Sequence, residues 1–238
     1  MTRSCRSTAE RESSKKREVK IMIEATRKHR PNLSEIAYDE IREMILSGEL
    51  AQGERIVLER MSEQLNLSIT PIREALNKLA QDDLIKVTPR SSYEVISLGP
   101  DDINDILDLR EMLETFALRT AGENLAQFPV GTFRESQQKI NSSGSYKRFV
   151  EADIKFHDTI VALSKNKRVG KLYGYIRNPE RMLMIPSAKI EGRIETAVKE
   201  HLAILKAIEN KDLDLAVENL RSHIQRVKSL LLQLHHEK

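Results

Sequence analysis

The sequence predicts a mainly α-helical protein in two parts: a small N-terminal unit of helices with one β-hairpin, and a larger all-helical bundle. Three observations favour this class. Hydrophobic residues make up 39% of the 238 residues. Aromatic residues make up only 4% and tryptophan is missing, a composition typical of helices packed through Leu, Ile and Ala. Apolar residues recur at helical spacing through most of the chain, and the clearest strand pattern is a hairpin within 85–96.

Residues 1–31 are predicted to form a basic, disordered leader that ends at Pro31. Such arms often associate with nucleic acid, although a solvated leader is the simpler interpretation. The leader lacks the apolar stretch of a signal peptide, and no run in the chain approaches the roughly 20 apolar residues of a membrane span. Cys5 is the only cysteine, so no disulfide can form within the chain. We therefore expect a cytoplasmic protein with no membrane contact.

Residues 32–98 carry the elements of a winged helix-turn-helix. Ser34 is expected to cap the first helix and Gly48 to end it. The expected elements are, in order, a helix at 34–48, a strand at 55–57, helices at 58–66 and about 68–82, and hairpin strands at 85–88 and 93–96. Helix, helix-turn-helix and hairpin in this order indicate a DNA-binding domain with a wing.

The DNA-reading residues are expected at the start of the second helix of the helix-turn-helix, because that end enters the major groove. Ser68 or Thr70 can cap the helix and contact a phosphate. Arg73 lies between apolar positions and points outward, where it suits guanine edges or phosphate. Asn77 follows one turn later on the same face, and Arg90 lies at the wing tip. Each residue alone is compatible with an ordinary surface, but the ordered set of elements favours DNA reading.

Gly99-Pro100 marks the boundary, and residues 100–238 are predicted to form an all-α domain of effector binding and dimerisation. About six helices are expected, at 101–126, about 129–141, 146–165, 168–185, 189–210 and 212–236.

Four polar residues fall on the apolar faces of three of these helices. Asp153 and His157 are one turn apart, and His201 and His223 become level if their helices pair antiparallel. A single buried histidine is more often an ordinary core residue. Burying an Asp beside three imidazoles without an ion, however, leaves costly unsatisfied groups. The cluster therefore predicts a divalent metal site with nitrogen and oxygen ligands.

The run SITPIREALNKLAQDDLI at residues 68–85 resembles the winged helix of the GntR family, whose usual run is Ser-Arg-Thr-Pro-Val-Arg-Glu-Ala-Leu. Two positions depart from the family. Ile69 stands where Arg is usual and removes a phosphate or base contact, and Ser92 stands where the wing usually has Gly. The resemblance implies a regulator that binds double-stranded operator DNA, with a half-site different from the usual one.

The second part resembles the FadR C-terminal ligand-binding domain of GntR regulators. Asp153-x-x-x-His157, the Glu-His pair that ends at His201, and His223 match its metal-bearing members. The resemblance implies a homodimer, a bound divalent ion such as zinc or nickel, and a small organic acid effector that completes the coordination.

Two further residues are effector-binding candidates through the same resemblance. Arg110 matches a family arginine that often faces the ligand pocket, and a helix-surface pair with Glu114 is an equal alternative. Asn166 matches a frequent family asparagine, for which a helix cap is the simpler role.

The sequence as a whole predicts a ligand-responsive transcription regulator, with a repressor favoured over an activator. A metal-dependent enzyme that uses the Asp/His cluster is one alternative, against which the spacing nominates no base or nucleophile beside the cluster. A constitutive DNA-binding protein with a vestigial sensor is the other, and the presence of all four candidate ligands argues against it.

Overall fold

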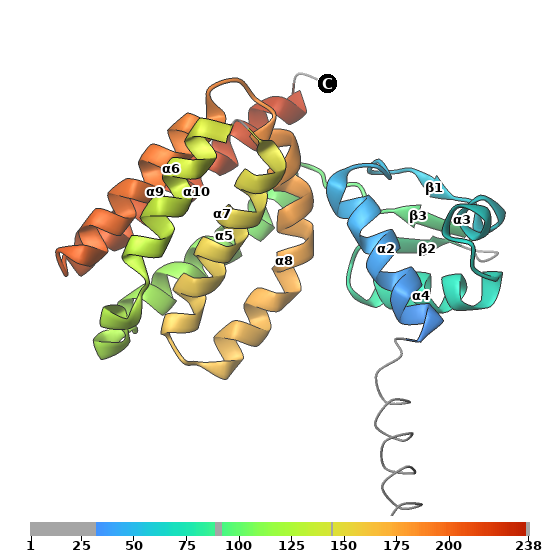
Figure 1. The fold of residues 1–238 in the computed structure, drawn as a ribbon, viewed down its shortest axis with the longest axis horizontal. Helices are drawn as coiled ribbons and strands as arrows, with labels where there is room; N and C mark the ends of the chain where they lie inside the picture. The colour runs from blue at the N-terminus through green and yellow to red at the C-terminus, as the bar shows by residue number, and fades with distance from the viewer. Residues whose placement is uncertain (1–31, 89–91, 144, 237–238) are drawn as a thin grey trace, which may run out of the picture.

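The computed structural model describes residues 32–88, 92–143 and 145–236, and it confirms the predicted mainly helical fold class. Figure 1 shows a small unit of helices and strands next to a helical bundle. The leader at 1–31 and Arg90 lie outside the described residues, so the predictions made for them stay predictions.

Helix α2 (Leu33–Ser47) opens the first unit, one residue before its predicted start. The cap is Asn32 and not Ser34, because the Asn32 side chain accepts the Ser34 N–H while Glu35 accepts the Asn32 N–H at 3.1 Å. This reciprocal pair satisfies N–H groups that have no partner inside the helix. Gly48 ends the helix as predicted, with a left-handed φ of 77°.

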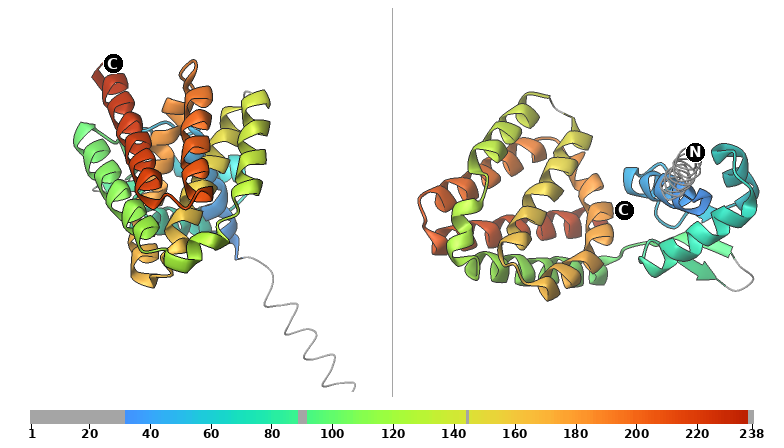
Figure 2. Two further views of the ribbon diagram at one scale, coloured as in Figure 1. Left: turned by 90° about the vertical axis from the view of Figure 1, so that its left-hand side faces the viewer. Right: turned by 60° about the horizontal axis from the view of Figure 1, so that its bottom comes forward.

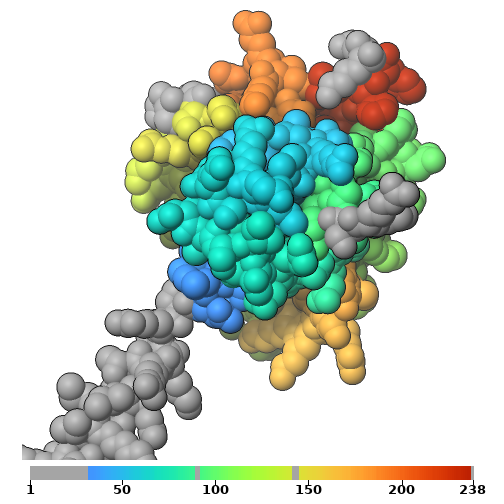
Figure 3. All heavy atoms as spheres, turned by 90° about the vertical axis from the view of Figure 1, so that its right-hand side faces the viewer, coloured from blue at the N-terminus to red at the C-terminus, as the bar shows by residue number. Residues whose placement is uncertain are grey.

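The helix-turn-helix and the wing follow the predicted order. The elements are β1 (Arg55–Ile56), α3 (Leu58–Leu65), α4 (Ile69–Gln81), β2 (Ile85–Thr88) and β3 (Ser92–Val95). The strands pair antiparallel in the order β1-β3-β2, with Val87 opposite Tyr93. Ile72, Leu76 and Leu79 of α4 are fully buried in the core of this unit, as their spacing predicts. Figure 3 views the unit from the side away from the bundle, with α3 and α4 in teal.

The bundle consists, in the described part of the chain, of α5 to α10 with one 3-10 turn. Its elements are α5 (Pro100–Arg119), η1 (Gly122–Gln127), α6 (Val130–Ser143), α7 (Tyr146–Leu163), α8 (Lys167–Ala188), α9 (Arg193–Glu209) and α10 (Leu213–His236). Two predicted boundaries are wrong, and both lie at glycines with positive φ. The helix expected at 101–126 ends before Gly122 (φ 52°), and the helix expected from 189 begins only after Gly192 (φ 73°).

Helix α8 forms the side of the bundle that faces the first unit (Figures 1 and 2). The guanidinium of Arg42 in α2 donates to the Asn178 side chain at 2.7 Å, and Arg181 pairs with Glu43 at 3.1 Å. Met182 is 4% exposed and belongs to the hydrophobic core of the first unit. One helix therefore contributes to both parts of the molecule.

Among the described residues, no helix combines the length and the apolarity that crossing a lipid bilayer requires.

Candidate metal centre and DNA-reading face

The four predicted metal ligands meet in the middle of the bundle. Asp153 and His157 come from α7, His201 from α9 and His223 from α10, and none of them is more than 1% exposed. Each residue offers one ligand atom, and these atoms lie within 4.8 Å of one another. The sequence predicts that His201 and His223 lie side by side on the antiparallel α9–α10 hairpin. This is confirmed, since their ring centroids are 4.7 Å apart.

Carboxylates orient two of the three imidazoles. Nδ1 of His157 lies 2.6 Å from Glu114 Oε2, and Nδ1 of His223 lies 2.7 Å from Glu200 Oε2. An ionised carboxylate can only accept a hydrogen bond, so each contact places the ring proton on Nδ1. The lone pair of each ring then lies on Nε2, which is how metal-binding histidines are commonly held.

The atoms that face one another in the cluster have no hydrogen-bond partner among the described residues. They are Nε2 of His157, both ring nitrogens of His201, Nε2 of His223 and both carboxylate oxygens of Asp153. Buried polar atoms are nearly always paired, so this group of polar atoms without hydrogen-bond partners is unusual, although His201 Nε2 lies 3.3 Å from Asp153 Oδ1. A divalent cation fits the group, since two imidazole lone pairs and a carboxylate are suitable ligands.

Burial favours the neutral form of two of the imidazoles, those of His201 and His223. Burial lowers the pKa of His223 to about 4, although its hydrogen bond to Glu200 acts in the opposite direction. Burial also lowers the pKa of His201 well below its usual value. Burial would raise the pKa of Glu200, but the hydrogen bond from His223 and the charge of Arg193 bring it to about 2. Neutral imidazoles beside ionised carboxylates are the protonation states that metal binding needs.

Arg110 lies against this cluster, wholly buried in α5. Its Nε donates to Glu114 at 2.8 Å, its Nη1 is 2.8 Å from Glu180 Oε1, and its Nη2 is 3.9 Å from Asp153. The pair with Glu114 considered from the sequence therefore exists, but it lies in the interior and not on the helix surface. The two glutamates raise the pKa of Arg110 well above its usual value against the effect of burial, so the guanidinium stays charged.

Sequence reasoning missed Glu180 and Tyr173, which complete the polar interior. The Tyr173 hydroxyl donates to Glu114 at 2.9 Å and lies 3.5 Å from Glu180. Burial raises the pKa of Glu180 to about 7, with Arg110 acting in the opposite direction. A signal was present, because Glu180 continues the apolar stripe of α8 that contains Val169 and Ile176. The sequence spacing nominates no base beside the cluster, but the fold brings two carboxylates, Glu114 and Glu200, against its histidines.

Asn166 has the capping role that the sequence favours. Its side-chain oxygen accepts the N–H groups of Arg168 at 3.0 Å and of Val169 at 3.4 Å, which makes it the N-cap of α8. The residue is exposed and does not belong to the buried cluster. Its role in effector binding stays a prediction.

The predicted DNA-reading residues line one exposed end of α4. Ser68 occupies the N-cap position without a side-chain capping bond, and Thr70 lies in the first turn. Arg73 is exposed, as its position between Ile72 and Leu76 predicts. Asn77 is exposed as well, but its side-chain oxygen accepts the Tyr93 hydroxyl at 3.1 Å, which links the reading helix to the wing. The contacts of these residues with DNA stay a prediction.

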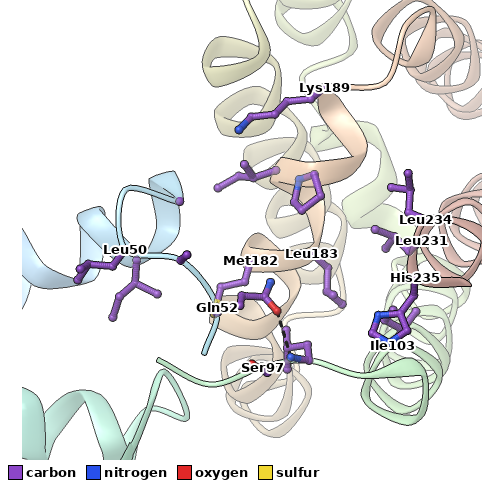
Figure 4. Close-up of a pocket in the computed structure, with 16 residues that line it drawn as sticks. Leu50, Gln52, Ser97, Ile103, Met182, Leu183, Lys189, Leu231, Leu234 and His235 are labelled. Carbon is purple, nitrogen blue, oxygen red and sulfur yellow. Dashed lines mark hydrogen bonds between the residues drawn. The ribbon is translucent and has the colours of Figure 1, made fainter. Parts of the chain in front are cut away.

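A cavity of about 450 Å³ separates the two parts of the molecule. Figure 4 shows Leu50 and Gln52 of the first unit on one side, Met182 of α8 and Lys189 just after α8 along it, and His235 of α10 opposite. None of the predicted effector or metal residues lines it. The cavity is therefore separate from the buried cluster.

Comparison with known proteins gives two adjacent family matches. Residues 33–95 match the gntR family of bacterial regulatory proteins, and residues 105–226 match the FCD domain. The chain is 25% identical over 190 residues to the HTH-type transcriptional regulator YdhC of Bacillus subtilis, covering 78% of this chain and 85% of that protein. It is 26% identical over 197 residues to the gluconate operon transcriptional repressor of Bacillus licheniformis, covering 79% and 81%. Escherichia coli McbR/YncC shares the fold, with a TM-score of 0.72, 22% identity, and coverage of 87% of this chain and 100% of that chain.

Proposed function

Because the chain belongs to the GntR family of bacterial regulatory proteins and carries an FCD domain, we propose that it is a repressor whose DNA affinity responds to a small organic acid. The family consists of DNA-binding transcription regulators and not of enzymes, as the sequence predicts. In this proposal residues 32–98 read operator DNA and residues 100–238 sense the effector.

The buried Asp/His cluster is the observation that carries the sensing part of the proposal. Asp153, His157, His201 and His223 would hold a divalent ion, zinc or nickel foremost, because their ligand atoms are close together and have no hydrogen-bond partner in the described part of the chain. Such an ion supplies a positive centre for an anionic ligand when it is bound. Arg110 adds a second positive group beside it, so the site suits a carboxylate.

Two exposed apolar pairs support a homodimer. Met112 and Phe116 are 58% and 45% exposed on α5, one turn apart, and Leu172 and Tyr175 are 48% and 61% exposed on α8. These two helices pack on each other in the monomer. Large apolar side chains gathered on neighbouring helices mark an interaction surface, and a second copy would cover them.

Elemental analysis of protein purified without chelators or a histidine tag tests the metal. About one equivalent of a divalent metal per chain is expected in wild-type protein, and its loss is expected in the His201→Ala variant. His235→Ala is the matched control, because that histidine is exposed near the end of α10. Wild-type protein without bound metal, even after incubation with zinc or nickel, would refute this part of the proposal.

Gel-shift titration with the DNA immediately upstream of the gene tests the reader. Arg73→Ala should weaken binding by about 1–3 kcal/mol if it contacts a base, or reduce the salt slope by about one if it contacts a phosphate. Arg119→Ala is the control, since this exposed cation lies at the far end of α5 and pairs with the exposed Asp214. Unchanged affinity and salt slope for the Arg73 variant would refute its role.

A further inference from the structure

We propose that Glu180 is a built-in competitor for the effector: its carboxylate occupies Arg110 in the effector-free protein, and an acid that replaces it on Arg110 releases α8. The proposal rests on the proposed function, because it assumes that the effector is a carboxylic acid. It adds that Glu180 sets the effector concentration needed for binding, and that α8 transmits the response to the DNA-binding unit.

The effector site is closed in this structure. Arg110 and Asp153 are 0% exposed and His223 is 1% exposed, so an acid cannot reach them unless a neighbouring group moves. Glu180 is 4% exposed and holds Arg110 at 2.8 Å. A carboxylate on a guanidinium is also the contact that an acid effector would make.

The two glutamates that share Arg110 are not equivalent. Glu114 also accepts hydrogen bonds from His157 and Tyr173, and it lies on the same helix as Arg110. Glu180 comes from a different helix, and its only other hydrogen bond among the described residues is the 3.5 Å contact with Tyr173. Glu180 is therefore the carboxylate that an incoming acid can displace.

Helix α8 is built to move where Glu180 lies. Pro179 directly precedes Glu180 and Pro186 follows within the same helix. Each proline removes one backbone hydrogen bond from the helix, so the helical hydrogen bonding is interrupted on both sides of this segment. The cavity of about 450 Å³ borders Met182 and Pro186 and leaves room for a shift (Figure 4).

The same segment contacts the DNA reader. Asn178 accepts a hydrogen bond from Arg42, and Met182 is buried in the core of the reader. These residues are two positions either side of Glu180. A displacement of Glu180 would therefore change the contacts of α2, which packs directly on α4, the reading helix. The effector acts through its different affinity for the two positions of α8.

The competition is tested with acetate as the probe and acetamide as its uncharged control, on zinc-loaded full-length protein. Glu180→Gln keeps the size of the side chain and removes the competing carboxylate; titrations are run at pH 8, above the Glu180 pKa of about 7. The variant should bind acetate about tenfold more tightly than wild type, measured by the rise of Tm with acetate concentration. The gain should be absent with acetamide and absent when Arg110→Gln is added. Glu191→Gln, an exposed site just after α8, is the matched control and should behave as wild type.

A Glu180→Gln variant that binds acetate no more tightly than wild type, or no acetate binding by either protein, would overturn the competition. Zinc content and DNA binding are measured on the same preparations. Failure of these two would refute the proposed function, whereas normal zinc content and DNA binding without the gain in acetate affinity would refute the competition alone.

The coupling is tested by adding Asn178→Ala to the Glu180→Gln variant. Acetate affinity should be unchanged, but the change in operator affinity that acetate causes should shrink. An acetate response of the same size in both proteins would overturn the route through α8.

Discussion

Replacing Glu114 by Gln should weaken metal binding although Glu114 is not a ligand. Oε1 of Glu114 accepts Arg110 and Tyr173, at 2.8 and 2.9 Å, while Oε2 lies 2.6 Å from Nδ1 of His157. The single oxygen of Gln can keep the first two contacts. Its NH₂ group then faces His157, which must accept at Nδ1 and carry its proton on Nε2. Nε2 is the nitrogen directed into the cluster, so it no longer has a lone pair with which to bind the metal.

The expected loss is about 10- to 100-fold in metal affinity, the usual effect of removing such a supporting contact, or about 1.4–2.8 kcal/mol. Zinc affinity is measured by competition with a chromophoric chelator at constant pH. Glu111→Gln is the matched control, because Glu111 lies on the same helix and pairs at the surface with Arg221. Glu111 is half-buried and does not contact the cluster, so zinc affinity should not change.

A Glu114→Gln variant with zinc affinity within about twofold of wild type would refute the tautomer argument. Loss of zinc binding in His157→Ala, measured in parallel, shows that the assay responds to this imidazole. A variant that unfolds is recognised by its circular dichroism before titration.

Three further predictions concern the dimer, the reader and the charge of the cluster. Phe116→Asp should convert the dimer to a monomer in sedimentation equilibrium, whereas Leu215→Asp, equally exposed on α10, should not; a dimeric Phe116 variant would place the interface elsewhere. Burial and the hydrogen bond to Asp82 raise the pKa of Tyr38 to about 12. The folded protein therefore holds this proton more tightly than the unfolded chain, and stability should fall as pH rises from 10 towards 12. Tyr38→Phe should lack this part of the slope in thermal melts, and an identical slope would contradict the assignment. Asp153→Asn should raise the Tm of metal-free protein while it weakens zinc binding, and a lower metal-free Tm would contradict the charge argument.

Most of the fold could be predicted from local pattern. The stripe of Ile72, Leu76 and Leu79 predicts the reading helix, and Gly48 predicts the end of α2. The N-cap of α2 was predicted wrongly because two nearby residues can each cap the helix. Asn32 caps α2 in place of Ser34, because only Asn32 has a Glu three residues later to complete the reciprocal pair.

The metal ligands could be predicted because their spacing in the sequence determines which of them lie close together in the fold. Asp153 and His157 are one turn apart, and His201 and His223 are related by a helical hairpin. The supporting residues are different, since Glu114 and Glu180 lie on two other helices whose packing no local pattern fixes. Their roles depend on contacts between residues that are far apart in the sequence.

The charge of the interior connects the metal with the proposed role of Glu180. One buried guanidinium, that of Arg110, faces the carboxylates of Glu114, Glu180 and Asp153, and burial lowers the pKa of the nearby His201 and His223. Burying an excess of negative charge is unfavourable by several kcal/mol per ion. A divalent cation would cancel that excess, which is why removing the charge of Asp153 should stabilise the metal-free protein. With the cation bound the interior is neutral, and an acid entering it would again add a negative charge. The acid can enter without that cost if the carboxylate of Glu180 leaves Arg110 for the solvent at the same time. The charge balance of the interior therefore favours the displacement of Glu180 that we propose.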